Sequence, residues 1–374
     1  MGEYLRSALN TISANWSSVD GVNGQNEIES ELIGTAIELK GQRLRFERVI
    51  SVGGFGYVFR VKDVQTQEQF ALKRLIAADK EAQQDVLNEV HILSKLQTHS
   101  HIMRFITSTQ VPNTNIFYIL TEFCACGSLA NLCLPITNTK QLNRILYQTS
   151  NAILHMHLLN IIHRDIKIEN ILFDSRGFVK LCDFGSATEK SYHPNSDWTP
   201  MQRSLVEDDF TRKTTPMYRP PEILDLYLNF SINKSMDIWA FGCMVFLMKF
   251  GQHPFEDSAK LRIINCNYQI PAGTPHNDVH VQLIRSCIQI NPDDRIRVEE
   301  VIEILERNFV DMIAPCVRPK QSSPIAGGSF GQATTPGGQI GGQPGSAQSV
   351  SQALSGFTKY LKDTSSKVMQ TVQQ

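Results

Sequence analysis

Three absences narrow the function of this 374-residue chain before any motif is considered. Lysine and arginine number 36 against 37 aspartates and glutamates, so no basic excess points to nucleic acid. The longest apolar run, residues 238–248, is about half the length of a membrane-spanning helix, and no signal peptide is visible. The eight cysteines lack paired metal-ligand spacing. We therefore expect a cytoplasmic protein with reduced thiols, no transmembrane segment and no zinc site.

Two acidic triplets near the middle of the chain are the most informative feature present. A His-Arg-Asp triplet at 163–165 is followed by Asn170, and an Asp-Phe-Gly triplet at 183–185 begins 18 residues after Asp165. Two apolar segments around a turn separate them, which predicts a β-hairpin. Phosphoryl transfer needs one carboxylate near the attacking hydroxyl, and a second carboxylate with an amide to hold Mg²⁺. Asp165 is the predicted catalytic residue, and Asn170 and Asp183 are the predicted metal ligands.

A glycine-rich segment upstream lies between two β-rich runs. Glycines there would let the backbone approach phosphate groups closely. Alone, such a hairpin is more often a plain turn, but its position before the other motifs favours a nucleotide loop. Glycine-rich nucleotide loops of this kind usually begin with a glycine, and this chain has a serine at that position. The predicted contacts with nucleotide are Ser51, Val52, Gly53, Gly54, Phe55, Gly56 and Val58.

Lys73 ends the next apolar strand. A lysine in this position normally extends to water. Glu89, 16 residues further on, lies in a segment (85–96) whose apolar residues recur at helical spacing. A solvated glutamate is the alternative for an isolated helix, but we expect Lys73 and Glu89 to form an ion pair.

Residues from about 40 to 310 resemble a eukaryotic protein kinase throughout. Residues 214–222 are similar to the end of an activation segment, and residues 237–242 to the start of the large central helix. Arg295 matches the arginine that forms a buried pair with Glu222 in this family. The resemblance implies an α+β, bilobal fold with a β-rich N-lobe and a mainly helical C-lobe. Lys167 has the form found in serine/threonine kinases.

The resemblance also implies roles at the active site, with ATP and Mg²⁺ as cofactors. Lys73, held by Glu89, would contact the α- and β-phosphates, and Lys167 and Thr215 would assist Asp165. Adenine would lie between the lobes, with Thr121 as gatekeeper. The further residues expected around it are Val58, Ala71, Glu122, Cys124 and Leu172.

Shorter strings narrow the resemblance to the Numb-associated kinase family. These strings are residues 53–55, 214–219 and 252–257. That family implies protein substrates among clathrin adaptor subunits, a role in membrane trafficking, and a cytoplasmic location, perinuclear, at the trans-Golgi or on coated vesicles. A pseudokinase or a recruitment scaffold remains the alternative, although no catalytic residue is missing.

The chain divides into four segments by composition. An N-terminal extension (1–32) precedes the kinase domain (33–312), whose lobes are expected at about 33–122 and 125–312. A Gly/Pro/Ser/Gln-rich stretch (315–349) predicts a disordered linker. The last segment (350–374) has apolar residues at helical spacing with lysines nearby. It could bind a membrane surface or a partner, or begin a domain of a longer protein.

The activation segment contains its own structural signal. Thr199, Pro200 and Gln202 form the pattern of a capping box with proline at the first helical position. We expect a short helix at about 200–209, with Met201, Leu205 and Val206 packed on the large lobe. Such a helix would order the loop without phosphorylation.

Overall fold

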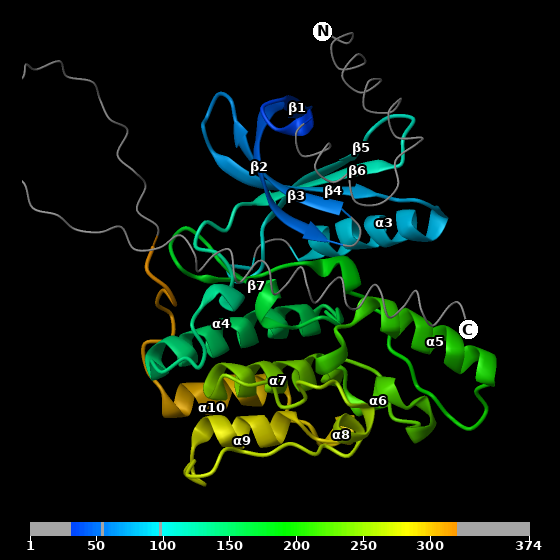
Figure 1. Cartoon of the computed structure of the whole chain (residues 1–374), viewed down its shortest axis with the longest axis vertical. Helices are drawn as coiled ribbons and strands as arrows, with labels where there is room; N and C mark the ends of the chain where they lie inside the picture. The colour runs from blue at the N-terminus through cyan, green and yellow to red at the C-terminus, as the bar shows by residue number, and fades with distance from the viewer. Residues whose placement is uncertain (1–30, 54–55, 97–98, 320–374) are drawn as a thin grey trace, which may run out of the picture. The chain divides into compact units, whose positions relative to one another are not determined.

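The computed structural model describes residues 31–53, 56–96 and 99–319, in which a β-sheet lies above a set of helices (Figure 1). The remaining residues, 1–30, 54–55, 97–98 and 320–374, fall outside the described part. A boundary between two units lies after Gln321. The predictions for the N-terminal extension up to residue 30, most of the linker and the C-terminal tail therefore stay predictions.

The sheet contains six strands in the order β1-β2-β3-β4-β6-β5, all paired antiparallel. The short β1 pairs with β2 at one edge of the sheet. In β3, every second residue is buried, which is the pattern of a sheet with one face on a core. The bounds are β1 (Ala36–Leu39), β2 (Gln42–Gly53), β3 (Gly56–Asp63), β4 (Gln69–Ile76), β5 (Phe105–Gln110) and β6 (Ile116–Glu122).

One long helix, α3 (Lys80–Lys95), belongs to the same lobe as the sheet (Figure 1). It begins where the Asp79 side chain accepts a hydrogen bond from the Ala82 N–H, at 2.8 Å. Val86, Ile92 and Leu93 are buried on one side of the helix. This stripe fixes the rotation of the helix, and therefore the direction in which its polar residues point.

The other lobe is mainly helical and contains one small hairpin. The hairpin strands are β7 (Ile171–Phe173) and β8 (Val179–Leu181), where the sequence predicted them. The helices are α4 (Thr139–Leu158), α5 (Pro200–Lys213), α6 (Pro221–Leu224), α7 (Ser235–Phe250), α8 (Lys260–Ile264), α9 (Val279–Cys287) and α10 (Val298–Asn308).

Helix α7 forms the centre of this lobe. Twelve of its 16 residues are buried, in agreement with its nearly uninterrupted apolar sequence. Gly242 lets α9 approach, since a Cβ there would lie 2.6 Å from the Cβ of Cys287. The expected bilobal α+β fold is confirmed. Among the described helices, none has the length and apolar character that a membrane crossing requires.

Candidate active site

Lys73 lies at the centre of a three-residue charge cluster between the lobes. Its Nζ is 2.7 Å from Glu89 Oε1 and 3.1 Å from Asp183 Oδ1. Burial alone would lower the pKa of Lys73, but the two carboxylates outweigh it and raise the pKa above the ordinary value. Lys73 lowers the pKa of Asp183 to about 2. The predicted Lys73–Glu89 pair is confirmed. The pKa shifts of Lys73 and Asp183 favour their charged forms, whereas burial raises the pKa of Glu89.

Helix α3 places Glu89 in this cluster. Glu89 is buried, one turn before Leu93 on the inward side of the helix. Gly185 packs against the cluster, because a Cβ there would lie 3.3 Å from Glu89 Oε2 and 3.6 Å from Lys73 Nζ. A larger residue at 185 would crowd the ion pair.

A second cluster surrounds Asp165, just before the hairpin. Thr215 donates to Asp165 Oδ1 at 2.6 Å, and Lys167 Nζ is 2.8 Å from Asp165 Oδ2. Lys167 also donates to the Thr215 hydroxyl at 2.9 Å. Thr215 lies 50 residues further along the chain, so this contact joins the end of the activation segment to the catalytic loop. The expected bridge between Thr215 and Asp165 is present.

Buried backbone contacts hold the loop that carries Asp165. The carboxylate of Asp237, at the start of α7, accepts the backbone N–H groups of His163 and Arg164 at 2.9 and 3.0 Å. Arg164 has a φ of 68°, a left-handed conformation that a non-glycine residue adopts only when its surroundings require it. His163 is fully buried, with its Nε2 3.1 Å from the carbonyl of Cys182. The central helix therefore sets the position of the catalytic loop.

The predicted metal ligands lie on either side of the hairpin. The side-chain amide of Asn170 donates to the backbone and side-chain oxygens of Asp165, at 2.8 and 3.2 Å. Its Oδ1 enters no hydrogen bond within the part of the chain that the structure describes. Asp183 has a φ of 62°, and half of its side-chain surface is exposed. An amide oxygen and a carboxylate suit Mg²⁺, which protein sites commonly hold through one or two such groups plus phosphate oxygens. The residues present therefore fit Mg²⁺.

The predicted adenine contacts gather on one face of the sheet. Val58 pairs with Lys73, and Ala71 with Thr121, so these residues follow the cleft face of β3, β4 and β6. Leu172 lies in β7 of the other lobe and is half-buried, between the buried Ile171 and Phe173. Figure 1 shows that hairpin beneath the sheet.

The side chains of Glu122 and Cys124, which were expected near adenine, point to other partners or are buried. Glu122 Oε1 accepts the Arg104 N–H at 2.7 Å and lies 2.8 Å from Lys180 Nζ. Cys124 is buried. Backbone groups are therefore what this segment can offer to adenine.

The glycine-rich loop is described only in part. Ser51 and Val52 are exposed, Gly53 ends β2, and Gly54 and Phe55 fall outside the described residues. Gly56 has a structural requirement of its own, because a Cβ there would lie 1.9 Å from the carbonyl oxygen of Arg74. Close packing of β3 on β4 explains that glycine without a ligand.

The activation segment contains the predicted helix, but the helix is longer and faces differently. Both halves of the capping box of α5 are present, and the helix continues to Lys213. Met201 and Leu205 are 73% and 60% exposed, so their predicted packing on the large lobe is wrong. Of the three predicted residues, only Val206 packs there. The fully buried positions are Arg203 and Phe210.

Two contacts of α5 were not foreseen. Asp209 lies 2.6 Å from Arg164, the residue before the predicted catalytic residue Asp165. Lys213 pairs with Asp85 on α3, four residues before Glu89. The only signal in the sequence was the acidic run at 207–209.

Glu222 and Arg295 form the buried pair that the resemblance implied. Two hydrogen bonds of 2.7 and 2.6 Å join the guanidinium to the carboxylate, and neither side chain is exposed. This pair joins α6 to the loop before α10.

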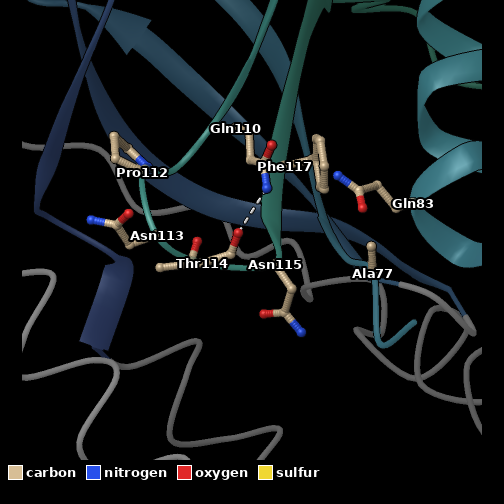
Figure 2. Close-up of a pocket in the computed structure, with 8 residues that line it drawn as sticks. All are labelled: Ala77, Gln83, Gln110, Pro112, Asn113, Thr114, Asn115 and Phe117. Atoms are coloured by element: carbon tan, nitrogen blue, oxygen red, sulfur yellow. Dashed lines mark hydrogen bonds between the residues drawn. The ribbon is translucent and has the colours of Figure 1, made fainter. Parts of the chain in front are cut away.

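A pocket of about 540 Å³ lies apart from these clusters, between the β5–β6 turn and α3 (Figure 2). Its lining consists of uncharged residues. Gln110 spans the turn and donates to the Thr114 carbonyl at 2.8 Å. No carboxylate or cation lines the pocket, so it offers no group for phosphoryl transfer.

Comparison with known proteins agrees with the geometry. Residues 44–306 match the protein kinase domain family. The chain is 37% identical over 279 residues to a probable serine/threonine-protein kinase of Dictyostelium discoideum, covering 72% of this chain and 24% of that protein. It is 30% identical over 293 residues to the actin-regulating kinase PRK1 of Saccharomyces cerevisiae, covering 73% and 35%. The chain thus spans about a quarter to a third of these relatives. It belongs to the protein kinase domain family.

Proposed function

We propose that this chain is an ATP- and Mg²⁺-dependent protein kinase that phosphorylates serine and threonine. The observation that carries the proposal is that both charge clusters are assembled at once. Lys73 contacts Glu89 and Asp183, while Asp165 contacts Lys167 and Thr215. A pseudokinase commonly lacks one of these groups.

Each cluster has a distinct part in the reaction. ATP supplies the phosphoryl group, and Mg²⁺ held by Asn170 and Asp183 would neutralise its charge. Lys73 binds phosphate oxygens while Glu89 fixes its direction. Asp165 orients the substrate hydroxyl, and Lys167 stabilises charge on the transferring group. Positioning and preorganised electrostatics then provide the catalysis.

The test is substitution of Asp165 by asparagine. We expect Asp165→Asn to abolish phosphate transfer while ATP binding stays nearly intact, because the carboxylate acts on the hydroxyl rather than on the nucleotide. Transfer is measured by phosphoamino acid analysis of a generic substrate, and binding by calorimetry. Equal turnover in the variant and the parent would refute the assignment.

The finer assignment is to the Numb-associated kinases, and within them the chain most resembles cyclin-G-associated kinase. It is supported by the short strings at 53–55, 214–219 and 252–257 and by a helix inside the activation segment. On this assignment the substrates are threonines in clathrin adaptor medium chains, and the protein works in membrane trafficking in the cytoplasm, near the trans-Golgi or coated vesicles.

Substrate choice is testable against two competing outcomes. One relative is named as an actin-regulating kinase, which makes actin-associated proteins an alternative substrate class. The other alternative is a recruitment scaffold of the coat machinery. Phosphorylation of adaptor medium chains should exceed that of actin-associated proteins and of basic or acidic peptides. Equal rates on all of them would remove the adaptor assignment, and no transfer to any would favour the scaffold.

We further propose that the site is competent without phosphorylation. Asp209 already supplies a carboxylate to Arg164, and α5 reaches α3 through Lys213. These contacts would do the work that a phosphate on the loop does elsewhere. Rapid, unprotected amide exchange across 200–209 in unphosphorylated protein would contradict this.

A further inference from the structure

A strap of residues 309–319 follows α10 and returns along α4 to the β7–β8 hairpin. Gln148, in the middle of α4, is fully buried. Its side-chain amide donates to the carbonyls of Met312 and Ala314, at 3.1 and 2.8 Å. The strap is therefore attached to α4 by a side chain that water does not reach.

The same side chain also holds the hairpin. Gln148 Oε1 accepts the backbone N–H of Val179 at 3.0 Å, and the Cys316 thiol donates to the same oxygen at 3.4 Å. Val179 is the first residue of β8. Gln148 thus joins the strap to β8. Its amide nitrogen bonds only the strap, and its amide oxygen bonds both the strap and β8.

A second contact reaches the hairpin turn. The carbonyl of Gly177 accepts the Cys316 N–H at 2.8 Å. Gly177 has a φ of 87°, and a Cβ there would lie 2.1 Å from the carbonyl oxygen of Val317. The strap passes so close to the turn that no side chain fits between them.

The hairpin determines where the two metal ligands lie. Asn170 immediately precedes β7, and Asp183 follows β8 after one residue. The Cys182 N–H donates to the Asn170 carbonyl at 3.0 Å, which ties the two ends together. Displacement of β8 would therefore change the position of Asp183 relative to Asn170.

We propose that the strap, acting through Gln148 and Gly177, is a positioning element for the Mg²⁺ ligands. Gln148 touches neither nucleotide nor metal in this scheme. It acts on Asp183 through β8, as outer-shell partners of metal ligands do. The inference rests on the proposed kinase function for its metal-dependent part only.

Two substitutions in the full chain test the proposal from opposite ends. Gln148→Met keeps the length of the side chain and removes its hydrogen bonds. Gly177→Ala places a methyl group against the strap. For each we expect about a tenfold rise in the Mg²⁺ concentration needed for half-maximal binding of a non-hydrolysable ATP analogue. Without metal, amide exchange at 177–181 should become faster.

Matched controls separate positioning from general damage. Gly273→Ala introduces alanine at nearly the same φ, 84°, but with no atom within 4 Å of the new Cβ. Tyr147→Phe removes a 2.9 Å hydrogen bond to Glu306 from the neighbouring position of α4. We expect both controls to leave the Mg²⁺ dependence and the exchange at 177–181 unchanged.

The outcomes are decisive in both directions. If Gly177→Ala behaves as Gly273→Ala does, or if both test variants lower the melting temperature without changing Mg²⁺ dependence, the proposal is wrong. Should Gln148→Met fail to fold, the two glycine variants still decide the question. A parent chain that binds the Mg²⁺-nucleotide but transfers no phosphate would defeat the kinase proposal and leave this one standing.

Discussion

Two ion pairs in this protein have similar N–O distances but differ in the exposure of the cation and in its other partners. Arg295 meets Glu222 at 2.6 Å with neither side chain exposed, and its guanidinium also donates to the carbonyls of Ser235 and Gln289. Lys73 meets Glu89 at 2.7 Å with 26% of the lysine side chain exposed.

The two pairs differ in whether a ligand can reach the cation. Arg295 is surrounded by acceptors and lies over the ring of Trp239, at 5.1 Å from its centroid, so a ligand could not reach it. Lys73 faces the cleft with two carboxylates that orient it. A short ion pair is therefore no sign of function by itself, and exposure of one partner toward a cleft is the informative feature.

The largest effect should follow from breaking the buried Arg295–Glu222 pair. Arg295→Met leaves the carboxylate of Glu222 buried and unpaired, which we expect to lower the free energy of unfolding by about 3–5 kcal/mol. Urea denaturation measures this. The double variant Arg295→Met/Glu222→Met should regain much of the loss, because apolar side chains replace both charges. Equal stability of the single variant and the parent would show that the pair does not hold the lobe.

Breaking the Lys73–Glu89 pair should lower catalysis instead of stability. Lys73→Met removes a preorganised cation, and we expect kcat to fall about 10²- to 10³-fold. Its melting temperature should change less than that of Arg295→Met, since half of Asp183 already reaches water and burial raises the pKa of Glu89, which favours the neutral form of that carboxyl. The comparison between the pairs fails if Lys73→Met is the less stable variant.

A smaller effect is expected at the contacts between α5 and α3. Lys213, with a side chain that is 12% exposed, pairs with Asp85, whereas Arg212 and Glu81 pair at 2.7 Å with both side chains more than half exposed. Lys213→Ala should lower kcat/KM about two- to fivefold, because α3 carries Glu89. Arg212→Ala is the matched control, with a change below about twofold. The reverse order would contradict a role for Lys213 in holding α3.

The smallest expected effect is on stability in mild acid, where the contributions of two buried histidines and of Asp183 are lost at different pH. Burial lowers the pKa of His253 and of His280 from an ordinary 6.5 to about 4. The unfolded chain binds protons that the folded chain refuses, so this contribution is complete above pH 6.5 and is lost as pH falls toward 4. Asp183 has a pKa of about 2 against an ordinary 3.8, so its contribution is lost only as pH falls below 3.8 through 2.

We therefore expect the melting temperature to decline between pH 6.5 and 4.5 while Lys73 and Asp183 stay charged. Calorimetry across that range is the measurement. A flat profile would show that the histidines are not buried in neutral form.

Sequence reasoning succeeded where chemistry constrains residue type. Lys73, Glu89 and Asp183 were identified because motif order and spacing leave few alternatives, and the capping box of α5 was readable from Thr199 and Gln202. The bilobal fold was expected from the resemblance to protein kinases that these motifs carry.

Sequence reasoning failed where a polar side chain is buried. Arg203 is buried because it donates to the backbone carbonyl of Asn195, at 2.5 Å, and to that of Leu226. Hydrophobic pattern assigns such an arginine to the surface, and so Met201 and Leu205 were turned inward by mistake. The strap of 309–319 has no period to recognise, because two backbone carbonyls and the Cys316 thiol attach it to Gln148.

Burial of Cys182 beside Asp183 has a consequence for the redox chemistry of the site. Burial, reinforced by the neighbouring carboxylate, raises the pKa of this thiol well above its ordinary value, and burial does the same for Cys124. The thiolate is the form that peroxide and alkylating agents attack. Cys182 and Cys124 therefore stay protonated at neutral pH, and oxidants should leave these two thiols unmodified.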